Sequence, residues 1–242
     1  MLSYILLWLE APFQSWGWNS KFGPRATECF PTKSGLYGMY LSAMGLRGGQ
    51  KDFLAAMNPY HQTVFCFTSS LIRNQKSLLV DYQVVGNGFD VEQYSGDKWY
   101  SLHIPRKQNG DIPNTGGAKI VFKHYLQDSK FAVIQEVGED LVGQISEALM
   151  NPVYEIFLGR KNCVPSDLVF RGVYDRFEEA NVNALRIAKE KGLGLAFTVS
   201  ETEKKGERIV LNDVPIMFGA EKQYRNREVF LLRQDADSSF TN

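Results

Sequence analysis

The spacing of hydrophobic and polar residues predicts strands early in the chain and helices further along it. An unbroken apolar run stops at Glu10 and indicates a buried first strand at about 2–10. In the stretch TVFCFTS, apolar and polar residues alternate, which favours a strand at 62–72. The segment GEDLVGQISEALMNP places apolar residues three and four apart and therefore predicts an amphipathic helix that ends before Pro152.

The same periods, with turn residues between them, predict the other elements. We expect a helix at 33–45 and a polar helix at 176–191. Further strands are predicted at 78–85, 119–126, 130–137, 193–200, 207–211 and 228–233. Short polar connections indicate two hairpins, one formed by 119–126 with 130–137 and one by 193–200 with 207–211.

Residues 86–118 have no clear period and are rich in glycine. A structureless segment of about thirty residues is rare inside a compact domain and is usually functional or disordered. Trp99 and Ile104 would be costly to leave in water, so we favour a projecting arm over plain disorder. The aromatic and basic residues expected to make contacts from this arm are Tyr94, Trp99, Tyr100, Arg106 and Lys107.

The order of elements predicts an α+β fold. Residues 1–150 give strand, helix, two strands, the inserted arm, a hairpin and a helix, which resembles a ferredoxin-like core with an insertion. Residues 151–242 are expected to form a smaller β-rich extension packed on that core.

Composition and charge narrow the function classes only slightly. The 242 residues include 27 Lys and Arg against 27 Asp and Glu, so any nucleic-acid surface must be a local basic patch. The three cysteines are far apart and odd in number, which favours reduced thiols in the cytosol over disulfides or a metal site. The first apolar run is too short to span a membrane and lacks a signal peptide's basic flank. We therefore expect a cytoplasmic protein without metal or cofactor.

The stretch ECFPTKSGLYGMYLSAMGLRGG places Lys-Ser-Gly at the start of a predicted helix. A nucleotide-binding P-loop is excluded by spacing, because Thr32 stands where that motif requires glycine. Thr32 can instead cap the helix and leave the N–H groups of Lys33, Ser34 and Gly35 free to bind an anion. Gly38 continues a nearly bare helix face that lets another backbone come close. The alternative is a well-capped buried helix with no ligand.

Three other segments combine aromatic, basic and small residues in a pattern typical of RNA contacts. They are the loop after the first strand (Gln14, Ser15, Trp16 and Gly17, with Arg25 beyond), FLGRKNCVPS (Arg160, Lys161 and Asn162) and EKQYRNREV (Tyr224, Arg225 and Arg227). Their aromatic residues could equally fill a core, and their charges could simply be solvated.

Catalytic signals are weak. Lys123 and His124 could serve a metal-independent ribonuclease, but neighbouring residues on a strand point to opposite faces. No paired carboxylates, catalytic triad spacing or metal cluster stand out in the sequence. The pattern argues for binding more than for catalysis.

Four segments in this order, LEAPFQSWG, FPTKSGLYGMYLSAMGL, FLGRKNCVPS and DVPIMFGAEKQYRNREV, carry a resemblance that spans nearly the whole chain. They resemble the CasD-like subunits of the type I-E CRISPR Cascade complex, which form the fifth Cas protein family within the RAMP superfamily. One departure is Val164, which separates Cys163 from Pro165 where relatives often have Cys-Pro directly.

The resemblance implies a modified RNA-recognition-type ferredoxin fold with a thumb, here the arm within 86–118. It also implies a subunit that grips the 5′ handle of the guide RNA (crRNA) and abuts the backbone subunit and the large PAM-reading subunit. Target DNA would be met only indirectly, through the complex. The implied RNA contacts are Gln14 to Gly17, Thr32 to Gly35, Arg160 to Asn162, Tyr224, Arg225 and Arg227.

Type I-C relatives are endoribonucleases with a Tyr/Lys/His arrangement, the tyrosine standing just before Pro-Thr. Here Glu28-Cys29-Phe30 occupies that place, and only Lys123 and His124 are similar to the remaining pair. The resemblance therefore implies a non-catalytic subunit. The rivals are a precursor-processing endoribonuclease and a small-ligand or protein-interaction module without RNA.

Overall fold

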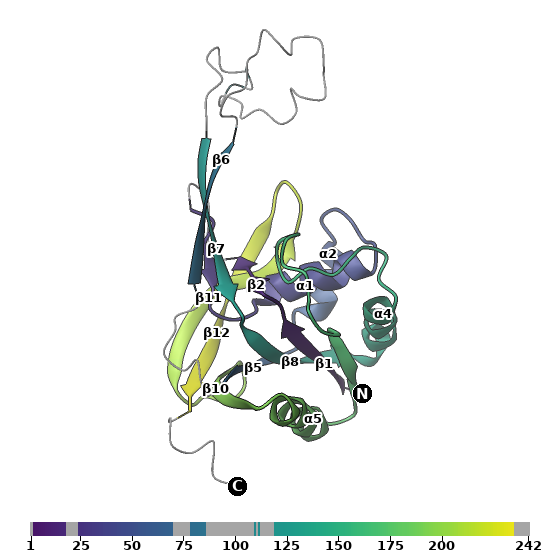
Figure 1. Ribbon diagram of the computed structural model, residues 1–242. Helices are drawn as coiled ribbons and strands as arrows, with labels where there is room; N and C mark the ends of the chain where they lie inside the picture. Colours follow the sequence, from purple (N-terminus) through teal and green to yellow (C-terminus); the bar gives the residue numbers. More distant parts are fainter. Residues whose placement is uncertain are drawn as a thin grey trace.

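The structure is a computed structural model that describes residues 2–17, 24–69, 78–85, 109, 111 and 119–234 (Figure 1). Its elements in chain order are β1 (Leu2–Glu10), β2 (Phe13–Gln14), β3 (Trp16–Gly17), β4 (Thr27–Glu28), α1 (Lys33–Ala43), α2 (Lys51–Met57), β5 (Gln62–Ser69), β6 (Leu78–Val85), β7 (Lys119–Gln127), β8 (Lys130–Gly138), α4 (Glu139–Met150), β9 (Phe170–Tyr174), α5 (Phe177–Glu190), β10 (Leu193–Ser200), β11 (Glu207–Met217) and β12 (Gln223–Arg233).

A seven-stranded sheet in the order β11-β12-β10-β5-β8-β1-β9 forms the centre of the molecule, and its strand pairs are antiparallel. Strand β1 lies between β8 and β9, and its apolar run is buried on both faces. Successive side chains on a strand point to opposite faces, so a run without polar interruptions fits a strand covered on both sides.

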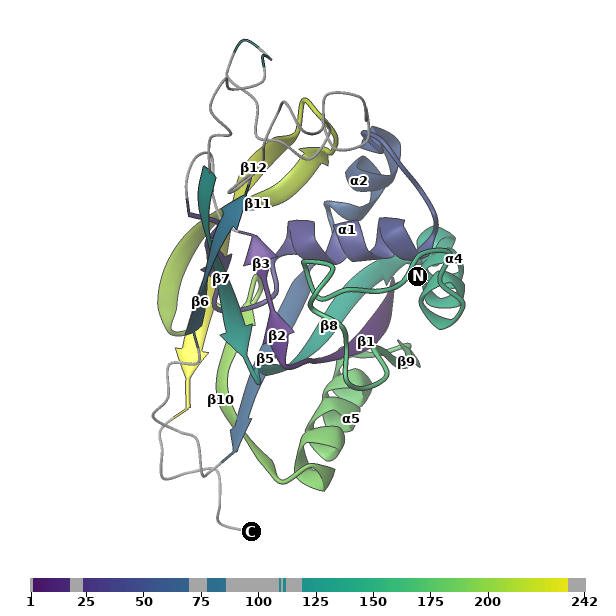
Figure 2. The ribbon, with the colours of Figure 1, turned by 45° about the horizontal axis from the view of Figure 1, so that its top comes forward.

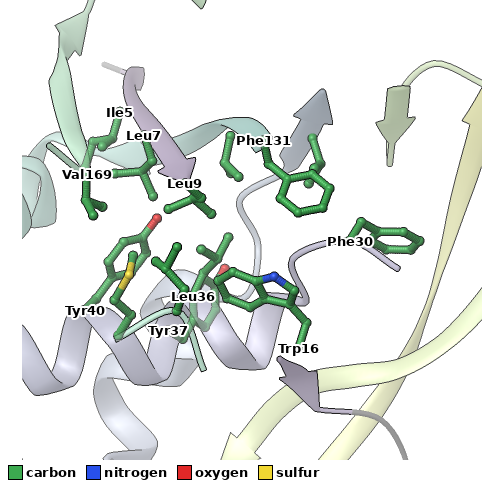
Figure 3. Close-up of a cluster of buried hydrophobic side chains, with 14 of the residues drawn as sticks. Ile5, Leu7, Leu9, Trp16, Phe30, Leu36, Tyr37, Tyr40, Phe131 and Val169 are labelled. Carbon is green, nitrogen blue, oxygen red and sulfur yellow. The ribbon is translucent and has the colours of Figure 1, made fainter. Parts of the chain in front are cut away.

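Helices cover the two faces of this sheet unequally (Figures 1 and 2). Ile5, Leu7 and Leu9 face the core formed with α1, α2 and α4, whereas Leu6 and Trp8 pack with α5. Figure 3 shows the first core, in which side chains of β1 meet the aromatic residues of α1 and the indole of Trp16. Helix α1 is thus fixed by its apolar side against the sheet, and its opposite side remains free to form a surface.

The predicted hairpin of 119–126 with 130–137 is wrong. Strand β7 pairs with β6 and β2 in a separate three-stranded sheet, while β8 pairs with β1 and β5. The chain leaves one sheet for the other at Asp128, which has a positive φ of 48° and donates its N–H to the Pro12 carbonyl at 3.1 Å. A tight connection in the sequence therefore marks a change of sheet.

The predicted hairpin of 193–200 with 207–211 is also wrong. Strand β10 pairs with β5 and β12, and the hairpin is formed by β11 and β12, both longer than expected. Strand β11 continues past residue 211 despite Pro215, because it is an edge strand of the sheet and its register with β12 shifts on both sides of that proline. Strands from before and after residue 150 belong to the same seven-stranded sheet. The division of the chain into a core (1–150) and an extension (151–242) stays a prediction.

Helix α2 was missed by the sequence prediction. It is only seven residues long, follows Gln50 at a positive φ of 49° and has no side-chain cap. Such a helix offers too few turns for a period to stand out, and its two buried residues, Leu54 and Met57, give little pattern. The expected mixture of helices and antiparallel strands is confirmed, whereas the ferredoxin-like arrangement stays a prediction.

Strands β6 and β7 form a ribbon that extends away from the body of the molecule (Figure 1). Most of 86–118, between these strands, lies outside the described residues, and so do the five predicted arm residues Tyr94, Trp99, Tyr100, Arg106 and Lys107. No helix in the described part of the chain is long and apolar enough to cross a membrane.

Candidate nucleic-acid interface

A groove of about 900 Å³ lies along the side of α1 that faces away from the sheet core. One wall is the bare helix face, made by Ser34, Gly35, Gly38 and Ser42. The other walls come from Ser15 and Gly17 and from the segment 153–161, which runs beside α1 in Figure 2. We call this surface the α1 groove. It brings together seven of the residues that the sequence singled out: Ser15, Gly17, Ser34, Gly35, Gly38, Arg160 and Lys161.

The glycines of α1 have different tasks. A Cβ on Gly38 would meet nothing within 4 Å, so this position opens the groove. A Cβ on Gly35 would lie 2.8 Å from the ring of Trp16, which is fully buried, so Gly35 lets the first loop pack on the helix. The bare face of α1 therefore borders the open groove at Gly38 and packs against the buried Trp16 ring at Gly35.

The N-terminus of α1 is closed by groups of the chain itself. Thr32 caps the helix, and its Oγ1 accepts a hydrogen bond from the Gly35 N–H at 3.2 Å. The Lys33 N–H donates to Oδ2 of Asp213 at 2.8 Å. The N–H groups of Lys33 and Gly35 therefore already have acceptors within the chain, which corrects the expectation that they are free to bind a phosphate.

The side chains behind this carboxylate form a buried charge network of Lys33, Glu201, Asp213 and Arg227. Nζ of Lys33 lies 3.2 Å from Oε2 of Glu201, and Arg227 donates to Glu201 and twice to Asp213, each at 2.7 Å. Burial lowers the pKa of Lys33, with Glu201 opposing the shift. Burial also acts to lower the pKa of Arg227, but the hydrogen bonds to Asp213 raise it overall. Neither cation is free for RNA, contrary to the sequence prediction.

The loop after β1 is a scaffold rather than a stacking platform. Gln14 is fully buried and donates Nε2 to the carbonyls of Leu9 and Ser129, at 3.2 and 2.6 Å, while its Oε1 accepts from Nε1 of Trp16. Trp16 has no exposed surface and therefore offers no face to a base, which corrects its predicted role. Of the described residues of this loop, Ser15 and Gly17 line the α1 groove.

The first loop also fixes the segment that carries the predicted cations. The Ser15 N–H donates to the Leu158 carbonyl at 3.1 Å, and Gly159 has a φ of +105°. A Cβ on Gly159 would lie 1.8 Å from the Ser15 carbonyl oxygen, so only glycine fits there. The close approach of these two backbones sets the position of Arg160 and Lys161.

Arg160 is held by neutral groups. Its guanidinium donates to the carbonyls of His124 and Arg25, at 3.0 and 2.7 Å, and stacks 4.6 Å from the centroid of Tyr125. No carboxylate in the described part of the chain pairs with it, so its charge is not cancelled and part of its five N–H donors stays available. Lys161 and Asn162 are exposed, and Lys161 lines the groove.

The remaining predicted residues lie elsewhere. Tyr224 is half-buried and Arg225 exposed on β12, and neither lines the α1 groove. Burial raises the pKa of Tyr224. Arg25 is exposed, and its backbone bridges to Lys123 of β7. Lys123 faces Asp81 in the ribbon and His124 faces Val80, so the two side chains lie on opposite sides of β7.

Sequence reasoning missed the aromatic and acidic lining of the groove. Tyr154, Glu155 and Phe157 line it, and Arg47 contacts Tyr154 from the loop after α1. Tyr154 stands three residues before Phe157, the first residue of FLGRKNCVPS, and this aromatic pair was a usable signal. Nothing in the sequence pairs Arg47 with Tyr154, 107 positions away.

Comparison with known protein families identifies the family of this chain. The family model described as CRISPR-associated protein (Cas_Cas5) matches residues 4–230. The chain belongs to this Cas5 family. Over 175 residues it is 25% identical to the Cascade subunit CasD of Escherichia coli strain K12, with 71% of each chain covered. The resemblance inferred from the four sequence segments is confirmed.

Two solved structures support the same fold. A chain of a CRISPR RNA-guided surveillance complex matches with a TM-score of 0.70 and 27% identity, covering 96% of this Cas5 chain and 90% of its own. A crystal structure of a Cas protein matches with a TM-score of 0.55 and 22% identity, covering 96% and 93%.

Proposed function

We propose that this Cas5-family chain is a non-catalytic subunit of a Cascade-type CRISPR surveillance complex, in antiviral defence, and that its α1 groove grips the 5′ handle of the guide RNA. The observation that carries the proposal is that Arg160 and Lys161, which pair with no carboxylate among the described residues, share one groove with the bare face of α1. Similarity to CasD and to a chain of an RNA-guided surveillance complex supports the assignment.

The groove suits a phosphodiester backbone in two respects. At Gly38 no side chain intervenes, so a ribose-phosphate chain can approach the helix backbone closely. Arg160 retains free N–H donors in a fixed orientation, and such donors form charge-assisted hydrogen bonds with phosphate. Single-stranded RNA bound by these contacts would show the salt dependence typical of phosphate binding.

The β6–β7 ribbon supports a second part of the proposal, contact with neighbouring subunits. One face of the ribbon exposes large hydrophobic side chains at paired positions. These residues are Leu78, Val80, Tyr82, Val84, Ile120 and Phe122. An apolar face of this kind marks a protein interaction site, and we propose that the backbone subunit of the complex covers it, with the large PAM-reading subunit nearby.

The non-catalytic part of the proposal rests on the separation of the candidate acid and base. Lys123 and His124 lie on opposite sides of β7, so they do not converge on one phosphate. Incubating the purified chain with labelled repeat RNA and EDTA should leave the RNA intact. Cleavage that is lost in His124→Ala would favour the endoribonuclease instead.

Two helical glycines provide a matched test of the RNA groove. Gly38 of α1 lines the groove, whereas Gly143 of α4 is exposed outside it, and a Cβ on either meets nothing within 4 Å. Gly38→Glu places a carboxylate among the phosphate-binding groups, so we expect at least tenfold weaker binding of a fluorescent RNA carrying the repeat-derived 5′ handle. Gly143→Glu should bind like the unmodified chain.

Fluorescence anisotropy at low salt measures both affinities, and circular dichroism confirms that both variants fold. Replacing a helical glycine whose Cβ meets nothing stabilises the helix by about 0.5–1 kcal/mol, so neither variant should melt earlier. Equal affinities for the two variants would contradict the assignment of the groove. An absence of handle binding by the unmodified chain at low salt would instead favour a protein-interaction module.

A further inference from the structure

The two ends of the α1 groove differ in chemistry. Near the start of α1 the groove is lined by Ser34, Gly35 and the cations of the 158–161 segment, which the first loop holds in place. Near the end of α1 it is lined by Ser42, Tyr154 and Glu155. Gly35 and Ser42 are seven residues apart, which corresponds to roughly 10 Å along a helix. A nucleotide bound in the groove can therefore place its phosphate and its base against different groups.

The position of Tyr154 is fixed by the backbone next to it. The Val153 N–H donates to the carbonyl of Ala43, at the end of α1, at 2.8 Å. The side chain of Val153 also fills the space beside Gly45, where a Cβ would lie 2.8 Å from it. Tyr154 is thus anchored to the helix and does not lie on a free loop.

One side of the Tyr154 ring already has a cationic partner. The guanidinium of Arg47 lies 5.0 Å from the ring centroid and also hydrogen-bonds the Tyr154 hydroxyl. The side chain remains 39% exposed and lines the groove. A ring supported by a cation on one side and open on the other is a suitable platform for a nucleobase, since every base has a π-face that stacks on an aromatic ring.

Glu155 is the unexpected group in this groove. A carboxylate repels phosphate, yet this one lines the same cavity as Arg160 and Lys161. Within the described residues Glu155 forms neither an ion pair nor a hydrogen bond, so its oxygens are free to accept. Carboxylates recognise bases by accepting hydrogen bonds from exocyclic amino groups, as with N4 of cytosine, whereas uracil carries a carbonyl oxygen in place of that amino group.

We propose that the end of the groove near Ser42 is a base-binding subsite, in which Tyr154 stacks on one base of the bound RNA and Glu155 accepts a hydrogen bond from its exocyclic amino group. The subsite rests on the proposed RNA-binding function and extends it: bases with an exocyclic amino group are preferred there over uracil. The bound nucleotide directs its phosphate toward Arg160 and Lys161 and its base toward Tyr154 and Glu155.

Three eight-nucleotide RNA homopolymers, of cytidine, adenosine and uridine, test this subsite with the full chain. Fluorescence anisotropy should show cytidine and adenosine oligomers binding about tenfold more tightly than the uridine oligomer. Glu155→Gln should bring this ratio close to one, because an amide both accepts and donates. The ratio is the informative quantity, since removing a negative charge strengthens binding of every RNA.

Tyr154→Leu and Tyr154→Phe separate stacking from packing. The leucine variant should bind all three oligomers about tenfold more weakly, while the phenylalanine variant should bind like the unmodified chain. The slope of affinity against salt should not change in either variant, because a base contact releases no counterions. Thermal melting of both variants confirms the fold.

The outcomes distinguish the subsite from the groove itself. If Gly38→Glu abolishes RNA binding but the unmodified chain shows no base preference and Glu155→Gln leaves the ratio unchanged, the subsite is overturned and the groove stands. If Gly38→Glu has no effect, or the unmodified chain binds none of the oligomers at low salt, both are overturned.

Discussion

Two pairs of cations near α1 have opposite surroundings. Lys33 and Arg227 lie in the buried charge network, where carboxylates of Glu201 and Asp213 neutralise them. Arg160 and Lys161 line the α1 groove, and the partners of Arg160 are carbonyl groups and an aromatic ring. The first pair holds the start of the helix in place, and the second is available to a phosphate. Residue type alone does not separate these two tasks.

The largest expected effect follows from breaking the buried charge network. Arg227→Ala leaves the carboxylates of Asp213 and Glu201 buried without their main partner, and removing one member of a buried ion pair costs about 3–5 kcal/mol. We expect a loss of this size in the free energy of unfolding, measured by urea titration.

Arg208→Ala is the matched control on the same hairpin, because Arg208 forms an exposed pair with Glu228 on the neighbouring strand. Exposed pairs contribute little, so this variant should unfold close to the unmodified chain. Similar losses for Arg227→Ala and Arg208→Ala would show that the network is not a structural anchor.

The next largest effect concerns the two glycines of α1. Gly35→Ala should destabilise the fold by about 1–3 kcal/mol, because its Cβ would lie 2.8 Å from the buried ring of Trp16. Gly38→Ala should instead stabilise it by about 0.5–1 kcal/mol, since its Cβ meets nothing and alanine favours the helix. Thermal melting measures both, and shifts of the same sign would contradict the division of the helix face.

The smallest effect is on thiol reactivity. Burial raises the pKa of Cys66 to about 12 and also raises the pKa of Cys163. A thiol with a raised pKa stays protonated at neutral pH, so the reactive thiolate forms only as the pH approaches the shifted pKa. At pH 8 both cysteines should react with Ellman's reagent far more slowly than free cysteine, and Arg227→Ala should accelerate the reaction. Rapid labelling of more than one thiol per chain would indicate a looser scaffold, since Cys29 is the one exposed cysteine of the three.

The sequence predicted most elements of this fold because local periodicity specifies a strand or a helix. It did not predict which strands pair: β7 separates from β8 at Asp128, and β10 pairs with β12 instead of β11. Strand pairing depends on which apolar faces are buried together. A short connection between two predicted strands does not reveal this.

The candidate site, too, could be predicted only where it depends on local motifs. The bare face of α1 and the cations Arg160 and Lys161 could be identified from local motifs, and the structure brings them together. The burial of Lys33 could not be foreseen, because its partners Asp213 and Glu201 are 180 and 168 positions away. The side chains of Trp16 and Gln14 were misread for a related reason: an aromatic or amide group after a strand serves equally well as core or as ligand.

The salt dependence of RNA binding counts phosphate contacts, so it shows whether Arg160 and Lys161 or the buried cations hold the RNA backbone. Affinities of the unmodified chain, Lys161→Ala and Lys33→Met for the handle RNA would be measured between 50 and 200 mM salt, well below each melting temperature. Lys161→Ala should reduce the log–log slope by about 0.7, the value for one phosphate contact in a single strand, and Lys33→Met should leave it unchanged. A reduced slope for Lys33→Met together with an unchanged slope for Lys161→Ala would contradict the account.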